Sequence, residues 1–276
     1  MISVIVPVFN ASRWIGNCIE SLLDQNYDSS EYEIVVVDNN SSDDSRSRIT
    51  RDWHVRLLEE TIQGSYAARN RGVAESRGEW LAFTDADCVA DRNWLASIQA
   101  AMRNARTQVV LGSRAAISES GTAGLLAAYD DARVRYILEN RRKRSYFAFT
   151  NNMAVRRSAF ERYGPFHTAA RGSDTLFLRR LTDGEGPQAV EWSAEMRVRH
   201  LEMRGAWTYI RKNFIYARAR RRTEHLGQCE TLQPAESLEI FRKVCRGRSV
   251  ADKIALALAL STGRLSWAAG SLRVNP

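Results

Sequence analysis

Short apolar runs alternate with helical segments along the first 111 residues, and this alternation limits the possible folds more than any other feature. Residues 2–6, 33–37 and 79–83 are largely apolar runs of strand length, typical of strands buried on both faces of a sheet. Between the first two runs, residues 12–23 place their apolar side chains on one helical stripe. Strands joined by helices at this pitch predict βαβ units with right-handed crossovers. The expected fold class is therefore α/β, with a mostly parallel central sheet flanked by helices.

Acidic side chains follow two of these predicted strands. Asp38 ends the second run, and Asp85 and Asp87 come just after the run at 79–83. Because ligands of such sheets bind at the carboxyl ends of the strands, we expect the three carboxylates to share one site. Asp85 and Asp87 project from the same side of extended backbone, and oxygen ligands placed together suit a hard divalent ion that also binds phosphates. Taken alone, residues 84–87 are also compatible with a solvated turn before a helix.

Six short segments resemble, in this order, those of the family-two inverting glycosyltransferases of the GT-A fold. They are Val-Pro-Val-Phe-Asn at 6–10, Val-Asp-Asn-Asn-Ser at 37–41, Ala-Arg-Asn-Arg-Gly at 68–72, Thr-Asp-Ala-Asp at 84–87, Gly-Ser-Asp at 172–174 and Val-Arg-His at 198–200. Each segment alone is weakly specific, whereas six in order are specific. The resemblance covers roughly residues 1–205 and leaves residues 206–276 unassigned.

The resemblance implies transfer of a hexosyl or hexosaminyl unit from a nucleoside diphosphate sugar, most often UDP-linked in this family, to a saccharide or lipid-linked acceptor. It places a divalent ion, Mn²⁺ or Mg²⁺, on Asp87 and His200. Asp174, expected at the N-terminus of a helix, would take the proton of the acceptor hydroxyl. Asn151 and Asn152 would line the acceptor side. The residues implied to bind the nucleotide sugar are Pro7, Val8, Asn10, Asp38, Arg69, Asp85 and Ala86.

Two departures from the family pattern keep a second hypothesis open. Ser173 stands where the family usually has Glu, and Leu176 stands where it often has an acidic residue. The absence of acidic residues at these two positions leaves the type of acceptor open. If catalysis needs a second carboxylate, the enzyme would be weak or inactive. The alternative is a GT-A-fold protein that binds a membrane surface or a polyanion. Asp38 and Asp174 also have simpler explanations, as a turn residue and a helix cap. A dehydrogenase is disfavoured, because no Gly-x-Gly-x-x-Gly follows the first strand.

The C-terminal part of the chain is strongly basic. Residues 197–276 carry 16 Lys and Arg against 6 Asp and Glu, whereas residues 1–196 are close to neutral. We therefore divide the chain into a catalytic domain at 1–205 and a basic helical extension at 206–276. Aromatic and basic residues on amphipathic helices predict peripheral contact with a membrane. Helices that pack on the catalytic body and expose a solvated basic face explain the pattern as well. No nucleic-acid recognition motif accompanies the charge, so no nucleic acid is expected as a partner.

Apolar runs and cysteines suggest a location. No run approaches the roughly 20 apolar residues of a membrane-spanning helix, and the first residues lack the features of a signal peptide. The four cysteines show no CxxC spacing, which disfavours a zinc site and a disulfide scaffold. The expected location is the cytoplasm, with any membrane contact at the inner face.

Overall fold

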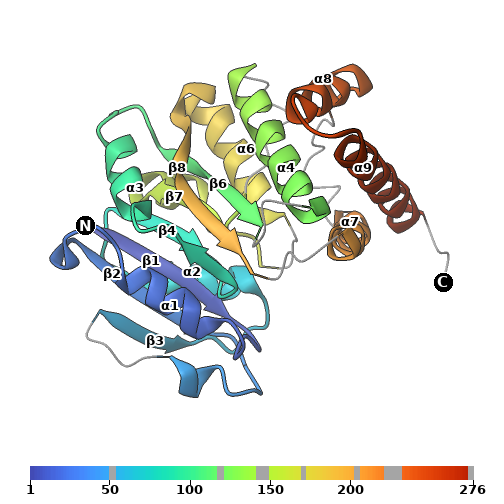
Figure 1. The fold of residues 1–276 in the computed structure, drawn as a ribbon. Coiled ribbons are helices and arrows are strands. Elements are labelled where there is room, and N and C mark those ends of the chain that lie inside the picture. Colours follow the sequence, from blue (N-terminus) through green and yellow to red (C-terminus); the bar gives the residue numbers. More distant parts are fainter. Residues whose placement is uncertain are drawn as a thin grey trace.

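A central eight-stranded sheet organises the computed structural model, which describes residues 1–49, 54–116, 121–140, 149–168, 172–201, 206–220 and 232–272 (Figure 1). From one edge to the other, the strands are β3 (Val55–Glu59), β2 (Tyr32–Asp38), β1 (Ile2–Val8), β4 (Trp80–Thr84), β7 (Asn152–Arg156), β6 (Val109–Ala116), β8 (Val190–His200) and β5 (Cys88–Ala90). The α-helices are α1 (Ile15–Leu23), α2 (Ser65–Glu75), α3 (Trp94–Met102), α4 (Gly121–Glu139), α5 (Arg157–Tyr163), α6 (Ser173–Glu185), α7 (Ala206–Arg220), α8 (Pro234–Cys245) and α9 (Val250–Ser271). Short 3-10 helices occupy Ser29–Glu31, Arg46–Arg48 and Pro187–Ala189.

The sheet is parallel in its first half and mixed in its second. β1 pairs in parallel with β2 and β4, and β2 pairs in parallel with β3, as the βαβ pattern predicts. β7 then runs antiparallel between β4 and β6, and β8 is parallel to β6 but antiparallel to the short β5. The α/β class with a central sheet flanked by helices is confirmed. The antiparallel strands matter for the site, because β5 brings the end of β8 beside the segment that follows β4.

The inner strands are buried on both faces, which explains why their sequences are continuous apolar runs. Along β4, Trp80 and Ala82 contribute to one hydrophobic core, which contains residues of α1 and α3. Leu81 and Phe83 point the other way, into a core with residues of α2, α4, α5 and α6. Helix α2 lies especially close to the sheet, because a Cβ added at Gly72 would be 2.6 Å from Cγ2 of Ile5.

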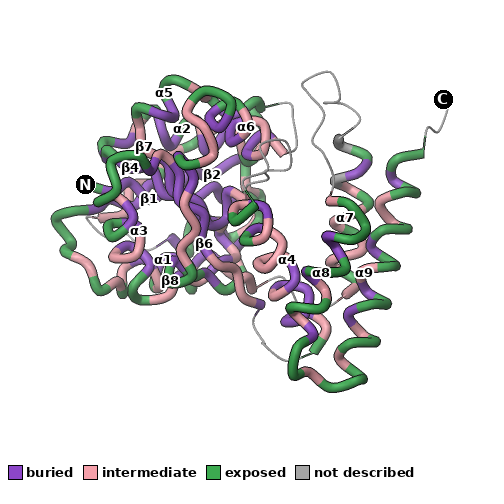
Figure 2. The backbone as a smooth tube through the Cα atoms, turned by 90° about the horizontal axis from the view of Figure 1, so that it is seen from above, coloured by how far each residue is buried: buried purple, intermediate pink, exposed green. Residues whose placement is uncertain are grey.

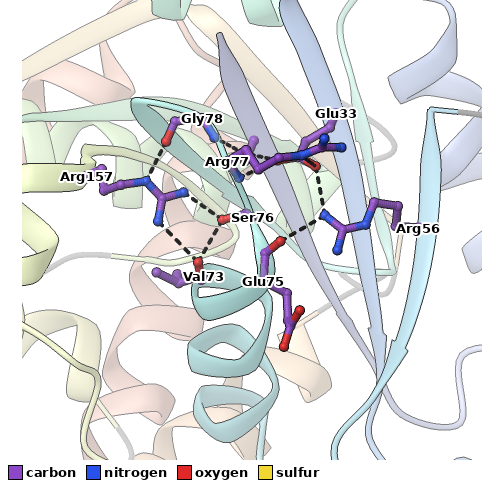
Figure 3. A network of polar contacts seen from close by, with 9 residues as sticks. Glu33, Arg56, Val73, Glu75, Ser76, Arg77, Gly78 and Arg157 are labelled. Atoms are coloured by element: carbon purple, nitrogen blue, oxygen red, sulfur yellow. Dashed lines mark hydrogen bonds and ion pairs between the residues drawn. The ribbon is translucent and has the colours of Figure 1, made fainter.

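A polar network fixes the C-terminal end of α2 to the sheet (Figure 3). The buried Glu33 carboxylate accepts hydrogen bonds from the Ser3 hydroxyl at 2.7 Å, the Arg77 amide at 2.6 Å and the Arg56 guanidinium at 3.1 Å. Burial on its own would raise the pKa of Glu33, but these three hydrogen bonds hold it below the ordinary value. Arg157 donates to three acceptors around the helix end: the carbonyls of Val73 and Gly78 and the hydroxyl of Ser76.

The helices α7, α8 and α9 lie together on the side of α4 that faces away from β1–β3 (Figures 1 and 2). A separate apolar cluster joins α8 and α9 to α4, with Ala206 and Tyr209 of α7 packed against it; it is formed by Leu125, Leu126, Tyr129, Ile240, Cys245, Leu256 and Ala259. α7 approaches α9 at the level of the backbone. A Cβ added at Gly263 would be 2.5 Å from Cε1 of Tyr209, and one at Gly270 would be 2.6 Å from the carbonyl oxygen of Phe214. Within the described ranges, no helix combines the length and the apolar character needed to cross a membrane.

Candidate active site

The segment between β4 and β5 carries Asp85 and Asp87 in a tight turn. The amide of Cys88 donates to the Asp85 carbonyl at 3.0 Å, and the amide of Leu201 donates to the Asp87 carbonyl at 2.7 Å. β5 pairs with β8 so that Cys88 lies opposite His200. This pairing brings Nδ1 of His200 to 3.4 Å from Oδ2 of Asp87. Two residues far apart in the sequence therefore meet at the carboxyl edge of the sheet.

Asp87 and His200 fit a divalent metal ion. Their side chains are only 19% and 12% exposed, and the potential ligand atoms of Asp87, Cys88 and His200 lie within 4.8 Å of one another. A carboxylate oxygen and an imidazole nitrogen together suit Mn²⁺ and leave further positions for other oxygen ligands. The Cys88 thiol is buried, which together with the charges of Asp87 and Asp85 raises its pKa well above the ordinary value, and its soft sulfur is a less suitable ligand for Mn²⁺ than oxygen or nitrogen. Asp87 and His200 are the two ligands that the resemblance implied.

Asp85 contacts a different partner. Nη2 of Arg69 donates to its Oδ1, and the Arg69 side chain is 4% exposed while that of Asp85 is 32% exposed. Arg69 lies in the second turn of α2, which begins directly after Gly64. Its Nε has no hydrogen-bond partner among the described residues. A buried guanidinium with an unused donor beside the strand ends is suited to an anionic or hydroxyl-rich ligand.

The ends of β1 and β2 form the expected nucleotide side. Asp38 pairs with Val8 in the register of these strands, and it is 3% exposed. Its Oδ1 lacks a hydrogen-bond partner in the part of the chain that the structure describes. Because an unpaired buried carboxylate oxygen is costly, this atom is suited to accept a hydrogen bond from a ligand. Pro7, Val8 and Ala86, also expected on the nucleotide side, are all buried, and Val8 and Ala86 belong to the hydrophobic core.

Asn10 connects the loops that follow β1 and β2. Its backbone has φ +48°, a left-handed conformation that asparagine tolerates, and its Oδ1 accepts a hydrogen bond from the Ser42 amide at 2.9 Å. The amides of Ala11 and Ser12 bind the side chains of Ser45 and Asp43, at 2.7 Å and 3.0 Å. These bonds hold the turn at 12–14, and α1 begins at Ile15 and not at residue 12, where its apolar stripe suggested a start.

Asn39 is a supporting residue that sequence reasoning missed. It is 2% exposed, and its amide donates to the carbonyls of Glu60 and Ile62, both at 2.8 Å. Its oxygen accepts a hydrogen bond from the Gly64 amide at 2.7 Å, immediately before α2. Asn39 therefore fixes the approach of the helix that carries Arg69. The sequence offers only a weak signal, a second polar residue at a strand end, because its partners lie more than twenty positions away.

Asp174 lies at the N-terminus of α6, as expected, and it is 7% exposed. Its oxygens accept hydrogen bonds from the amides of Thr150 at 3.2 Å and Thr175 at 2.8 Å. Burial raises the pKa of Asp174, against the opposing influence of these hydrogen bonds and of the positive charge on Arg69. Arg69, the ion-pair partner of Asp85, is therefore also close enough to Asp174 for its charge to lower the pKa of that carboxyl.

The two asparagines expected on the acceptor side differ in their surroundings. Asn151 is 8% exposed, and its Oδ1 has no hydrogen-bond partner within the described ranges. Asn152 is 2% exposed, and all of its polar atoms have partners inside the protein. Its amide donates to the carbonyls of Ser113 and Met196, both at 2.7 Å, and its oxygen accepts a hydrogen bond from the indole of Trp94 at 2.8 Å. The expectation for Asn152 is therefore corrected: its amide joins strands to α3 and is not available to an acceptor.

Ser173 is fully buried and accepts a hydrogen bond from the amide of His167. In this chain, the position where the family usually has Glu thus supports the loop before α6.

Comparisons with known proteins bear on this geometry. A sequence model of the family described as "Glycosyl transferase family 2" matches residues 3–164. The glycosyltransferase AglE of Haloferax volcanii is 35% identical over 190 residues, which are 66% of this chain and 61% of the relative. The glycosyltransferase GlyG of Streptococcus pneumoniae is 30% identical over 118 residues, 41% of this chain and 38% of that relative. The matched part thus spans less than two thirds of either relative.

Solved structures show the same fold. The mannosyltransferase PcManGT from Pyrobaculum calidifontis, in complex with GDP-Man and Mn²⁺, superposes with a TM-score of 0.64 at 21% identity over 98% of this chain and 76% of its own. TarS 1–349 of S. aureus, in complex with UDP, gives 0.56 at 15% identity over 98% and 90%. The glucosyl-3-phosphoglycerate synthase of Mycobacterium tuberculosis, with Mn²⁺, UDP-Glc and phosphoglyceric acid, gives 0.52 at 21% identity over 72% and 71%. The fold is therefore the GT-A fold.

Proposed function

The chain belongs to glycosyl transferase family 2, and on that premise we propose that it transfers a sugar from a nucleoside diphosphate sugar to the hydroxyl of a saccharide or lipid-linked acceptor, with inversion at the anomeric carbon. The observation that carries the proposal is the meeting of Asp87 and His200 beside the Arg69–Asp85 pair. A residue pair suited to a metal ion and a buried guanidinium group thus lie at the same edge of the sheet. Such an arrangement suits a diphosphate leaving group.

Each side chain has a role in this proposal. Asp38 accepts a hydrogen bond from the base or the ribose, and Arg69 holds the ribose or the diphosphate while it neutralises Asp85. A divalent ion, Mn²⁺ or Mg²⁺, held by Asp87 and His200 would neutralise the charge that develops on the departing diphosphate. The Mn²⁺ complexes of two of the structural neighbours support this choice of ion.

Asp174 is the proposed general base. Its carboxylate takes the proton of the acceptor hydroxyl as the oxygen attacks the anomeric carbon, while the sugar–phosphate bond breaks. The raised pKa of Asp174 supports this role, since a stronger base accepts the proton more readily. Asn151, with its unpaired oxygen, is the proposed contact for a hydroxyl of the acceptor.

Uridine is the nucleotide that we propose for the donor, because UDP-sugars are the usual donors of the family that the chain resembles. The TarS complex with UDP and the synthase complex with UDP-Glc support this choice. GDP is the rival, because PcManGT is in complex with GDP-Man. The sugar itself and the acceptor are outcomes of the experiment below.

The test is release of nucleoside diphosphate from UDP-sugars and from GDP-mannose, with Mn²⁺ and then with EDTA. The matched variants are Asp87→Asn and Asp24→Asn, the latter an exposed aspartate that pairs with Arg92. We expect one donor to be hydrolysed slowly, with release abolished by EDTA and by Asp87→Asn but not by Asp24→Asn. Equal release by Asp87→Asn would refute the metal site. If no donor is bound or hydrolysed, the transferase proposal fails and the non-catalytic GT-A alternative stands.

The outer face of α9 supports a second proposal, contact with an anionic membrane surface. Its exposed apolar residues follow a helical stripe and are Val250, Ile254, Leu258 and Leu265, continued by Leu272 just after the helix, with exposures between 54% and 72%. The exposed basic residues Lys253 and Arg264 lie on the same helix. Apolar side chains flanked by positive charge suit a bilayer that contains anionic lipid.

Sedimentation with phosphatidylcholine vesicles, with and without phosphatidylglycerol, tests this surface. We expect binding only to the anionic vesicles, and its loss in Leu258→Asp/Leu265→Asp with donor hydrolysis unchanged. Binding that survives the double substitution would show that this face is not responsible.

A further inference from the structure

Tyr66 connects the helix that carries Arg69 with the candidate base. It lies in the first turn of α2, three positions before Arg69, so that both side chains project from the same side of the helix. Its hydroxyl forms a hydrogen bond with the Asp174 carboxylate, which opposes the effect of burial on the pKa of that group. The amides of Thr150 and Thr175 donate to the same carboxylate, at 3.2 Å and 2.8 Å. Tyr66 thus adds a side-chain donor to two backbone donors at Asp174.

The ring of Tyr66 is held in place by Phe166. The two ring centroids are 5.4 Å apart, and Phe166 is buried, with its ring 5.6 Å from that of Phe177 on α6. The backbone of Phe166 is fixed to α2 as well, because the Asn70 side chain donates to its carbonyl at 2.8 Å and accepts from its amide at 3.1 Å. Phe166 therefore joins the two helices that carry Tyr66 and Asp174.

Arg69 contacts the same tyrosine ring. Its guanidinium carbon lies 5.4 Å from the centre of the Tyr66 ring, while the guanidinium pairs with Asp85. Arg69 and Tyr66 are the charged and the titratable side chain of α2 that act on Asp174. In the described part of the loop before α6, the titratable side chain is that of His167, which is exposed. A change of Tyr66 to phenylalanine would remove the hydroxyl and leave the ring for Arg69 and Phe166.

A hydroxyl suits a carboxyl group that must change its protonation state. A backbone amide only donates, whereas a tyrosine hydroxyl can donate a hydrogen bond to the ionised carboxylate and accept one from the protonated carboxyl. A general base passes from the first state to the second when it takes the proton of the acceptor hydroxyl. Because the Tyr66 ring is fixed, its hydroxyl can keep the carboxyl group in one orientation in both states, and reaction rates depend steeply on such alignment.

We propose that Tyr66 is a positioning residue of the transfer reaction, whose hydroxyl holds the carboxyl group of Asp174 in one orientation before and after it takes the proton. The inference rests on the proposed function, because it needs Asp174 to be the general base. It assigns a role to a residue outside the segments that carry the family resemblance, since the third of these begins at Ala68.

The first measurement titrates Asp174 by carbon NMR, in protein labelled at the carboxyl carbons of aspartate. The spectrum of Asp174→Asn, which lacks the signal, identifies it. Because the hydrogen bond favours the charged form, its removal in Tyr66→Phe should move the titration of Asp174 to higher pH. Tyr163→Phe is the matched control, since the Tyr163 hydroxyl donates to Glu185 at 2.9 Å, and it should leave this titration unchanged. An unchanged titration in Tyr66→Phe would overturn the inference.

The second measurement follows Mn²⁺-dependent hydrolysis of UDP-sugars and of GDP-mannose over the same pH range. In hydrolysis, water takes the place of the acceptor and gives its proton to Asp174. We expect Tyr66→Phe to lower kcat about tenfold, as for the loss of one hydrogen bond to a charged group. The rise of the rate with pH should move to higher pH, and KM for the donor should not change. A loss confined to KM, or an equal loss of kcat in Tyr163→Phe, would contradict the positioning role.

The outcomes for the two proposals differ. If Asp87→Asn abolishes hydrolysis while Tyr66→Phe keeps the rate and the pH profile of the unmodified protein, the role of Tyr66 is refuted and the transferase proposal stands. If the unmodified protein hydrolyses no donor, the transferase proposal fails. The inference then fails with it, even where Tyr66→Phe moves the titration of Asp174.

Discussion

The guanidinium of Arg69, on α2, lies against the carboxylate of Asp85, in the turn after β4. This contact gives Asp85 a different role from Asp87, which is only two positions further along the chain. Asp85 is neutralised from within the protein, whereas Asp87 faces His200. Two carboxylates this close would otherwise repel each other. The pair leaves Asp87 as the principal negative charge that a metal ion meets.

Removal of Arg69 should therefore affect stability as well as activity. In Arg69→Met the Asp85 carboxylate loses its partner beside Asp87, and we expect the free energy of unfolding to fall by about 1–3 kcal/mol. Asp85→Asn in the same background should recover part of that loss, with a coupling energy of about 1–2 kcal/mol in a double-mutant cycle measured by urea unfolding. Strictly additive effects would show that the contact does not stabilise the protein.

Asp174→Asn should separate activity from stability. The amide keeps an acceptor for the Thr150 amide but cannot take a proton, so that sugar transfer should fall by about 10²–10⁴-fold while UDP binding is unchanged. Burial disfavours the charged form of Asp174, but the amide keeps only one of its two acceptor oxygens, so the two effects oppose each other and the stability at neutral pH should change little. A variant that loses stability and UDP binding together would indicate a structural helix cap.

The pH dependence of the reaction follows from the same residue. A base must be ionised, so the transfer rate should rise with pH through the raised pKa of Asp174 and then level off. Its contribution to stability has the opposite sign. A folded pKa above the unfolded one means that stability declines as pH rises between the ordinary value of an Asp and the raised value. Rates and urea midpoints measured over the same pH range check both directions.

Glu33 should make an acid-sensitive contribution to stability. Its pKa is lowered in the folded protein, so its contribution is complete above the ordinary pKa of a Glu and is lost as pH falls through the lowered folded value. Glu33→Gln should lower the free energy of unfolding by about 1–3 kcal/mol at neutral pH, because charge-assisted hydrogen bonds are replaced by weaker ones. The difference should shrink in acid. Glu20→Gln, at an exposed position on α1, is the control.

The sequence predicts those parts of the fold and the site that depend on local pattern. The strands β1, β2 and β4 are continuous apolar runs because both of their faces are buried, and Asp38, Asp85 and Asp87 follow from the topology of such a sheet. The start of α6 at Ser173, next to Asp174, was equally predictable from Gly172 and the helical residues after it.

Features that depend on tertiary contacts were not predictable in this way. Asn152 looked like a polar loop residue, yet its partners come from β6, β8 and α3, and no spacing in the sequence encodes that meeting. β5 is only three residues long and exists because β8 pairs with it. Lys212 belongs to a basic stretch whose charge suggested a membrane. The contact between Lys212 and His200 depends on the packing of α7 against α9, which the sequence alone does not reveal.

The close approach of α7 to α9 also affects how the chain can vary. Because Gly263 faces Tyr209 and Gly270 faces the backbone of Phe214, a bulkier residue in α9 would require a compensating change in α7. The two helices would therefore have to be exchanged as a pair in any chimera with a relative. A chimera that joins residues 3–164, which match the family, to another relative's C-terminal helices would replace the lysine at His200 along with the helices that hold it.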